Sequence, residues 1–169
     1  MNPDLFWIPG PWRGKLAIVT RPRGGDWLED EAAGWRRSGL NAVVSLLESD
    51  EAAQLELAHE GQAAESNGVL FISFPIPDLG VPVSIQEALA LLKTIGGYLE
   101  AGKSVAVHCR QGIGRSGLIA AGVLMAFGAG AEKAIEVVSA ARGLTIPETR
   151  AQLEWLHQLT SEYPVVSAS

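Results

Sequence analysis

Four short, continuous runs of apolar and β-branched residues constrain this chain more than any other feature: residues 16–20, 41–47, 69–76 and 104–109. They do not alternate with polar residues, as expected for strands that are buried on both faces of a sheet. Helix-like segments separate them, and such alternation predicts an α/β fold with a mostly parallel sheet. We therefore expect one domain over residues 1–169, with a central sheet of four to five strands flanked by helices on both faces.

The helix-like segments differ in character. The segment 84–102 opens with a capping box, in which Ser84 precedes Glu87. The segment 115–127 is apolar nearly all round, which predicts a central helix. The other expected helices are 26–37, 50–65, 131–141 and 147–161, the last led by Pro147 near its first turn. The last residues, 165–169, are expected to fray.

Composition narrows the class of protein. The chain has 169 residues, of which 47% are hydrophobic and 19% charged, so it has material for a core and is unlike a disordered chain. Its net charge of −6 argues against broad electrostatic binding to nucleic acid or to an anionic membrane. Any anion site must therefore be built locally. No segment has the pattern of a secretory signal or the roughly 20 apolar residues of a membrane span, so we expect a cytoplasmic protein.

A single cysteine excludes an internal disulfide and a cysteine-based zinc site. The histidines, at positions 59, 108 and 157, lack the spacing of metal ligands. We therefore expect neither a metal nor another cofactor.

The one cysteine, Cys109, ends the fourth apolar run, and Gly112 and Gly114 follow it. Ligands of an open α/β sheet bind beyond the carboxyl ends of its strands. The glycines let backbone N–H groups turn inward around an anion, and the next helix adds its positive N-terminus, which also favours a thiolate. Arg115 carries a rigid fork of donors that matches two phosphate oxygens. These features together predict phosphoryl transfer to sulfur.

The segment "HCRQGIGRSG", residues 108–117, matches the H-C-x-x-G-x-x-R-[S/T] signature of the cysteine-dependent protein tyrosine phosphatases. In length and element order the chain resembles the small dual-specificity branch of that superfamily. Around the loop it is most similar to the kinase-associated phosphatase group and its bacterial relatives. The resemblance covers residues 5–160 and is strongest over the signature region, 69–160.

The resemblance implies a role for each residue of the loop. Cys109 is the expected nucleophile, Arg115 the phosphate clamp, and Ser116 a hydrogen-bond donor to the thiolate. His108 is expected to brace the loop from behind. The phosphate would be bound by the loop residues Arg110, Gln111, Gly112, Ile113, Gly114 and Arg115.

Two other segments complete the resemblance. In "FPIPDLGVP", Asp78 lies 31 positions before Cys109, in a segment whose prolines predict a loop, and it is the expected proton donor to the leaving group. "IPETRAQ" resembles the family's Q-T-x-x-Q element, which orients the hydrolytic water. Thr149 and Gln152 match that element, but Glu148 replaces its first glutamine. The substitution leaves the second chemical step open, since a carboxylate orients water but also repels phosphate.

The predicted activity is the hydrolysis of phosphotyrosine in proteins or peptides through a cysteinyl-phosphate. A shallow site would also admit phosphoserine and phosphothreonine. Phosphate, sulfate or vanadate would occupy the same site. Arg21 and Arg23, after the first strand, are candidate substrate contacts, with a charged turn as the alternative. Two other functions stay open. One is a rhodanese-like sulfurtransferase, whose loop is usually shorter. The other is a phosphate-binding module that has lost turnover: the intact Cys109, Arg115 and Asp78 argue against it, but Glu148 keeps it open.

Overall fold

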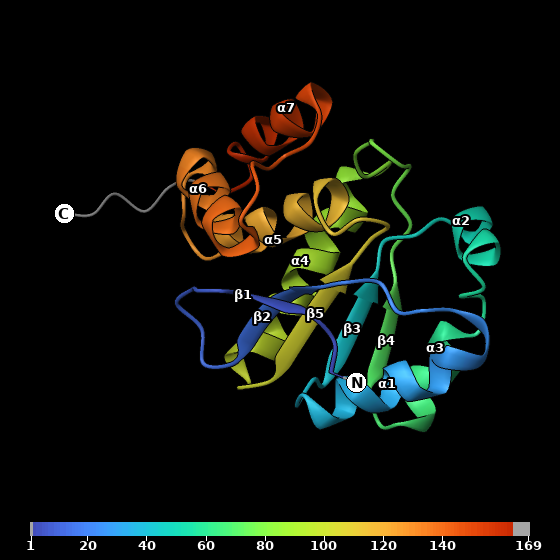
Figure 1. Ribbon diagram of the computed structural model, residues 1–169. Coiled ribbons are helices and arrows are strands. Elements are labelled where there is room, and N and C mark those ends of the chain that lie inside the picture. Colours follow the sequence, from blue (N-terminus) through green and yellow to red (C-terminus); the bar gives the residue numbers. More distant parts are fainter. Residues whose placement is uncertain (1, 164–169) are drawn as a thin grey trace.

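The computed structural model describes residues 2–163, and its strands form one five-stranded sheet in the order β1-β2-β5-β3-β4 (Figure 1). Strands β2, β5, β3 and β4 are parallel, and β1 pairs with β2 in the antiparallel direction. This confirms the predicted fold class. The strand bounds are β1 Leu5–Ile8, β2 Lys15–Val19, β3 Ala42–Ser45, β4 Leu70–Ser73 and β5 Ser104–His108.

Strand β5 occupies the middle of the sheet, and its register positions the site. Ala106 of β5 lies level with Ala17 of β2 on one side and with Val43 of β3 on the other. At the carboxyl end, His108 pairs with Ser45. The residue that follows β5, Cys109, therefore emerges at the sheet edge where ligands of such folds bind.

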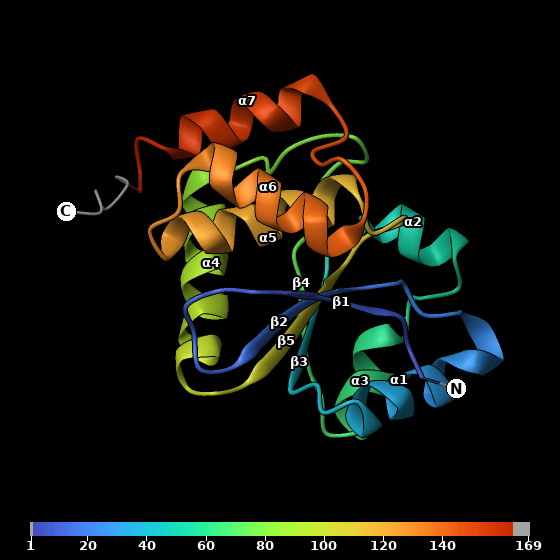
Figure 2. The same ribbon diagram turned by 60° about the vertical axis from the view of Figure 1, so that its left-hand side comes forward.

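Helices cover both faces of the sheet, as predicted (Figures 1 and 2). One face packs against α4, α5 and α6, with α7 lying over α5, and the other packs against α1 and α3. Every residue of α5 from Gly114 to Met125 is buried, so this helix is central, as its apolar sequence predicts. The bounds are α1 Leu28–Arg37, α2 Ser49–Gln54, α3 Glu60–Ser66, α4 Ile85–Glu100, α5 Gly114–Ala126, α6 Ala131–Arg142 and α7 Arg150–Leu159.

The single helix expected over residues 50–65 is wrong, because the segment forms two short helices, α2 and α3. Between them Glu56 adopts a left-handed conformation, with φ of 58°, and its carbonyl accepts a hydrogen bond from the N–H of Gly25. Leu57, directly after this break, is buried in the core beneath α1 and α3. Burial of that side chain and the contact with Gly25 are long-range gains that local helix propensity does not register.

The predicted start of the last helix is also wrong. Pro147 follows a cis peptide bond and lies outside the helix, and α7 begins only at Arg150, with Thr149 as its N-cap. At α4, the Ser84 hydroxyl accepts from the N–H of Glu87, which confirms the cap.

No helix within residues 2–163 combines the length and the apolar character that crossing a membrane requires. The expected frayed tail, 165–169, lies outside the described residues.

Candidate active site

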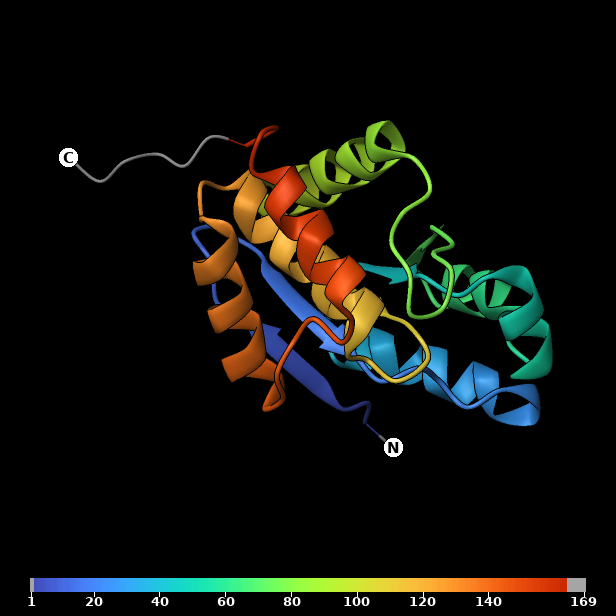
Figure 3. The same cartoon turned by 90° about the horizontal axis from the view of Figure 1, so that it is seen from above.

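The loop between β5 and α5 and the segment between β4 and α4 lie side by side (Figure 3). Together with the start of α7 they enclose a cleft of about 210 Å³. Cys109 and Arg115 line it from one segment and Asp78 from another. The three residues that the sequence analysis assigned to one site are therefore neighbours in the structure. The complete lining is Asp78, Leu79, Cys109, Arg110, Gln111, Gly114, Arg115 and Glu148.

The loop between β5 and α5 depends on two of its glycines, for different reasons. Gly112 has a φ of 70°, in the left-handed region that residues with side chains disfavour. At Gly114 the constraint is space, since a Cβ would lie 3.0 Å from a carboxylate oxygen of Glu148 and 3.0 Å from Oε1 of Gln152. The loop thus has one glycine for its turn and one for close approach to α7.

Arg115 is buried, and its guanidinium donates hydrogen bonds to four other residues, two through their side chains and two through their backbone carbonyls. Nη1 and Nη2 donate to the two carboxylate oxygens of Glu51, at 2.6 and 2.9 Å. Nη1 also donates to the carbonyls of Ile76, at 2.9 Å, and Leu46, at 3.4 Å. Nη2 donates to Asp78 at 3.1 Å. The arginine head is therefore fixed in orientation, with its Nε–H outside these contacts.

The same contacts set the protonation of the pair. The hydrogen bonds from Arg115 lower the pKa of Glu51, against burial, which raises it. Burial lowers the pKa of Arg115, but the hydrogen bond to Glu51 and the electrostatic interactions with neighbouring groups outweigh burial and raise it. Both partners are therefore charged at neutral pH.

A family model described as "Polymorphic toxin system, DSP-PTPase phosphatase" matches residues 18–129, which include the Asp78 segment and the whole signature loop. The chain belongs to the DSP-PTPase phosphatase family. This confirms the resemblance to the small dual-specificity phosphatases.

Relatives of this phosphatase domain agree. A tyrosine phosphatase of Invertebrate iridescent virus 6 is 39% identical over 94 residues, which are 53% of this chain and 34% of the viral protein. Protein tyrosine phosphatase domain-containing protein 1 of Mus musculus is 34% identical over 131 residues, 72% of this chain but 17% of the mouse protein. The chain thus spans about a third or less of these curated relatives.

Two solved structures show the shared fold. Tk-PTP in its active form is 31% identical, with a TM-score of 0.78 over 95% of this chain and 99% of that one. Kinase associated phosphatase, with its catalytic-site cysteine substituted by serine, has a TM-score of 0.88 over 99% of both chains at 18% identity, which is a likeness of fold alone.

Not every predicted site residue of this phosphatase domain faces the cleft. Among those that do not line the cleft are Gly112 and Ile113 in the loop, and Ser116 in the first turn of α5. Ser116 is fully buried, and its Oγ has no hydrogen-bond partner among residues 2–163. A buried hydroxyl without a partner is costly, so this donor is available to a neighbouring thiolate. Its bond to Cys109 stays a prediction.

His108 lies behind the loop, as expected, and it is fully buried. Its Nδ1 lies 3.3 Å from the carbonyl oxygen of Cys109, and its Nε2 contacts the carboxylate of Glu60. Trp35 stacks against the ring, with centroids 6.5 Å apart. The histidine thus links the backbone of the predicted nucleophile to α3.

Two arginines hold the loop from its outer side, and the sequence pointed to only one of them. Arg21 Nε donates to the carbonyl of Arg110 at 3.0 Å. Arg142, at the end of α6, donates to the carbonyls of Gly112 and Gln111, at 2.8 and 3.4 Å. In a trans peptide the N–H points opposite to the carbonyl, so pinning these carbonyls outward turns the N–H groups of residues 111–113 inward. The other candidate, Arg23, instead pairs with Glu31 at 2.5 Å.

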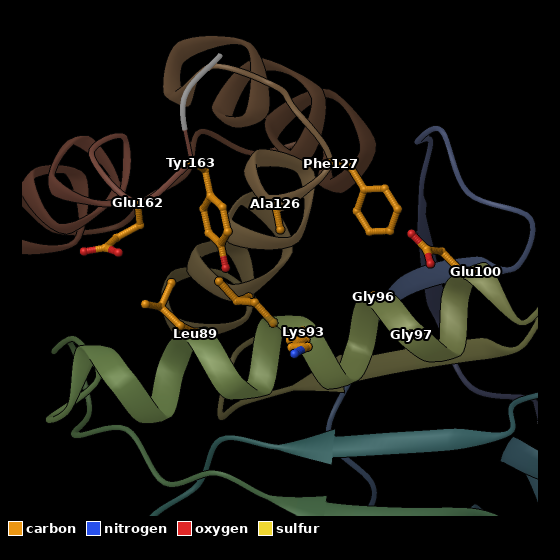
Figure 4. Close-up of a pocket in the computed structure, with 10 residues that line it drawn as sticks. Leu89, Lys93, Gly96, Gly97, Glu100, Ala126, Phe127, Glu162 and Tyr163 are labelled. Carbon is orange, nitrogen blue, oxygen red and sulfur yellow. The ribbon is translucent and has the colours of Figure 1, made fainter. Parts of the chain in front are cut away.

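A larger cavity, of about 520 Å³, is elsewhere (Figure 4). It lies between α4, the end of α5 and Tyr163, whose side chain points toward α4. Burial raises the pKa of Tyr163. None of the signature residues lines this cavity, so the smaller cleft is the candidate active site. Within residues 2–163 no cluster of three or more His, Cys, Asp or Glu side chains is placed to hold a metal ion.

The pair of Glu51 and Arg115 predicts a pH-dependent loss of stability in Glu51→Gln. We expect the free energy of unfolding of this variant to be about 2 kcal/mol lower near neutral pH, because a charged, bidentate contact is weakened. The lowered pKa of Glu51 means that the contribution is present above its usual value of 4.5 and lost as the pH falls below it. The measurement is urea unfolding across the acid range.

Asp50→Asn is the matched control, since Asp50 is exposed on the same helix and carries the same charge. It should change stability little. A Glu51→Gln penalty that stays constant into the acid range would contradict the pairing.

Arg142→Gln tests the outer support of the loop. We expect the inhibition constant of inorganic phosphate to rise by about tenfold, less than the loss of a direct anion donor, because the loop N–H groups become less well ordered. Arg150→Gln removes the same charge from a side chain that is 91% exposed and pairs with Glu154. Equal phosphate binding by the Arg142 variant and this control would refute the role of Arg142.

Proposed function

We propose that this chain is a phosphomonoester hydrolase that acts on phosphotyrosine, and also on phosphoserine and phosphothreonine, in proteins or peptides. The observation that carries the proposal is the cleft that Cys109, Arg115 and Asp78 line together. These three residues provide a nucleophile, a charged clamp and a proton donor, which the transfer of a phosphoryl group to sulfur requires. A cytoplasmic location stays a prediction from the sequence.

In the first step, the thiolate of Cys109 attacks phosphorus while the phosphate oxygens bind the loop N–H groups and Arg115. The Nε–H of Arg115 is one donor for phosphate, and Nη2 becomes the second when phosphate displaces the carboxylate of Asp78. The S–P bond forms as the bond to the leaving oxygen breaks, and protonated Asp78 gives its proton to that oxygen.

In the second step, water attacks the cysteinyl-phosphate, and Asp78 takes a proton from the water. The S–P bond breaks, the thiolate leaves, and Ser116 stabilises it with a hydrogen bond. Glu148 faces the cleft and is exposed, so it is the member of the 148–152 element that meets the phosphate or the water.

The size of the cleft supports a small phosphorylated group as the part that enters. Sites for drug-sized molecules measure about 300–1,000 Å³, whereas this cleft has about 210 Å³. The phosphoryl group and its leaving atom fill it, and the rest of a peptide lies on the rim, where the exposed Leu79 contacts it. Phosphate, sulfate and vanadate are expected competitive inhibitors.

The two alternatives are separable by activity. The family match and the Asp78 contact support a phosphatase over a rhodanese-like sulfurtransferase, which needs no proton donor. Glu148 in the cleft keeps a phosphate-binding module with weak turnover as the second alternative, because a carboxylate stands where the family's water-orienting element has its first glutamine.

Cys109→Ser tests the proposed nucleophile. We expect hydrolysis of p-nitrophenyl phosphate to fall by more than about a thousandfold, while phosphate binding, followed by calorimetry, changes little. The wild-type protein should not transfer sulfur from thiosulfate to cyanide. Full activity in the variant would refute the mechanism, and sulfur transfer would support the first alternative.

Glu148→Gln tests the one departure from the family pattern. Removal of a negative charge from the cleft should lower KM for p-nitrophenyl phosphate by a few fold, about the effect of one nearby charge in a partly solvated site. Glu154→Gln, an exposed change further along α7, is the control. A fall in kcat without a change in KM would instead assign Glu148 to the hydrolysis step.

A further inference from the structure

The turn that carries Asp78 adopts an unfavourable backbone conformation. The N–H of Gly80 donates to the carbonyl of Pro77 at 2.8 Å, which closes a turn with Asp78 and Leu79 at its centre. Leu79 has a φ of 61°, a left-handed conformation that residues with side chains rarely adopt. Its side chain is 54% exposed, so packing does not account for it. Such a conformation persists only where surrounding contacts hold it.

Those contacts come from the N-terminus of α7. The hydroxyl of Thr149 donates to the carbonyl of Leu79 at 3.3 Å. Nε2 of Gln152 donates to the carbonyl of Gly80 at 3.0 Å. Two consecutive carbonyls of the turn are thus held by two side chains of one helix start.

Gln152 is committed to this arrangement. Its Oε1 accepts from the N–H groups of Glu148 and Thr149, at 3.1 and 3.2 Å, so both lone pairs of the oxygen are engaged. The side chain is fully buried and does not line the cleft. This placement differs from the water-orienting role that the family resemblance implies, because the amide is buried outside the lining of the cleft.

The other end of the turn is anchored as well. The carbonyl of Ile76 accepts a hydrogen bond from Arg115 at 2.9 Å, and the N–H of Ile76 donates to the carbonyl of Leu46 at 3.0 Å. Asp78 therefore lies between an anchor on the phosphate clamp and an anchor on α7. Its carboxylate meets Arg115 at 3.1 Å from this position.

We propose that Thr149 and Gln152 are positioning residues that hold the Asp78 turn, and so serve proton donation to the leaving group in the first chemical step. This inference rests on the proposed phosphatase function. It predicts a dependence on the leaving group: a poor leaving group needs the proton from Asp78, whereas a good one departs with less help. A residue that orients water acts after the leaving group has gone, so its loss lowers kcat without a leaving-group-dependent fall in kcat/KM.

Gln152→Glu is the sharpest variant, because it keeps an acceptor for the two N–H groups and replaces the donor to Gly80 by a carboxylate oxygen that repels the carbonyl. We expect kcat/KM for phenyl phosphate to fall at least about tenfold more than kcat/KM for p-nitrophenyl phosphate, whose leaving group is better. Thr149→Val removes the other donor from a half-exposed position and should show the same pattern more weakly, while Thr149→Ser keeps the hydroxyl and restores it. Gln158→Glu, exposed on the same helix, is the control.

Hydrogen exchange gives a second measurement that does not require activity. Amide exchange at residues 79–81 should accelerate in Gln152→Glu and Thr149→Val but not in Gln158→Glu. Unchanged exchange would overturn the proposed contacts. Faster exchange with equal losses for both substrates, or with a burst of phenol release before slow turnover, would overturn the role in proton donation. A wild-type protein that exchanges as expected but hydrolyses neither substrate would refute the proposed function and this catalytic role with it.

Discussion

The buried guanidinium of Arg115 is the group on which the rest of the site depends. A buried charge is tolerated only when its donors are satisfied. Here the partners are four residues: Glu51 on α2, Leu46 after β3, Ile76 after β4, and Asp78 on the turn that follows Ile76. The arginine itself lies in the first turn of α5. One side chain therefore joins the carboxyl ends of parallel strands, and the contact that fixes the proposed phosphate clamp also fixes the proposed proton donor.

The sequence predicted the parts of this arrangement that are local. Continuous apolar runs identify strands buried on both faces, and all four expected runs contain strands of the sheet. The loop from His108 to Ser116 is contiguous, so its chemistry is visible without the fold. Asp78 is not contiguous with it, and only the family resemblance placed it beside Cys109. The sequence allowed for a fifth strand but did not locate β1, because a run of four apolar residues is not specific to a strand.

The residues that the sequence did not reveal are polar groups on short or exposed-looking helices. Glu51 and Glu60 lie in a strongly polar segment, where a solvated face is the ordinary expectation. Their burial follows from the break at Glu56, which gives α2 and α3 different directions and lets one carboxylate meet Arg115 and the other His108. Arg142 likewise ends α6, where a basic residue already suits the helix dipole. Such partners become visible only when the chain has folded, since the contacts span 30 residues or more.

An acidic chain with an anion site raises the question of how the charges balance. Arg115 is neutralised by Glu51, and Asp78 and Glu148 add negative charge to the cleft. Besides the donors of Arg115, an incoming phosphate would meet the set of loop N–H groups and the N-terminus of α5. Arg21 and Arg142 strengthen this set, because each bonds to loop carbonyls and neither has a carboxylate partner within residues 2–163. Their charges are therefore not cancelled locally, and they lie on the loop itself. Under the proposed function, the site would attract an anion through oriented backbone dipoles that are supported from outside. It would then need no basic surface, so the net charge of −6 is compatible with phosphate binding.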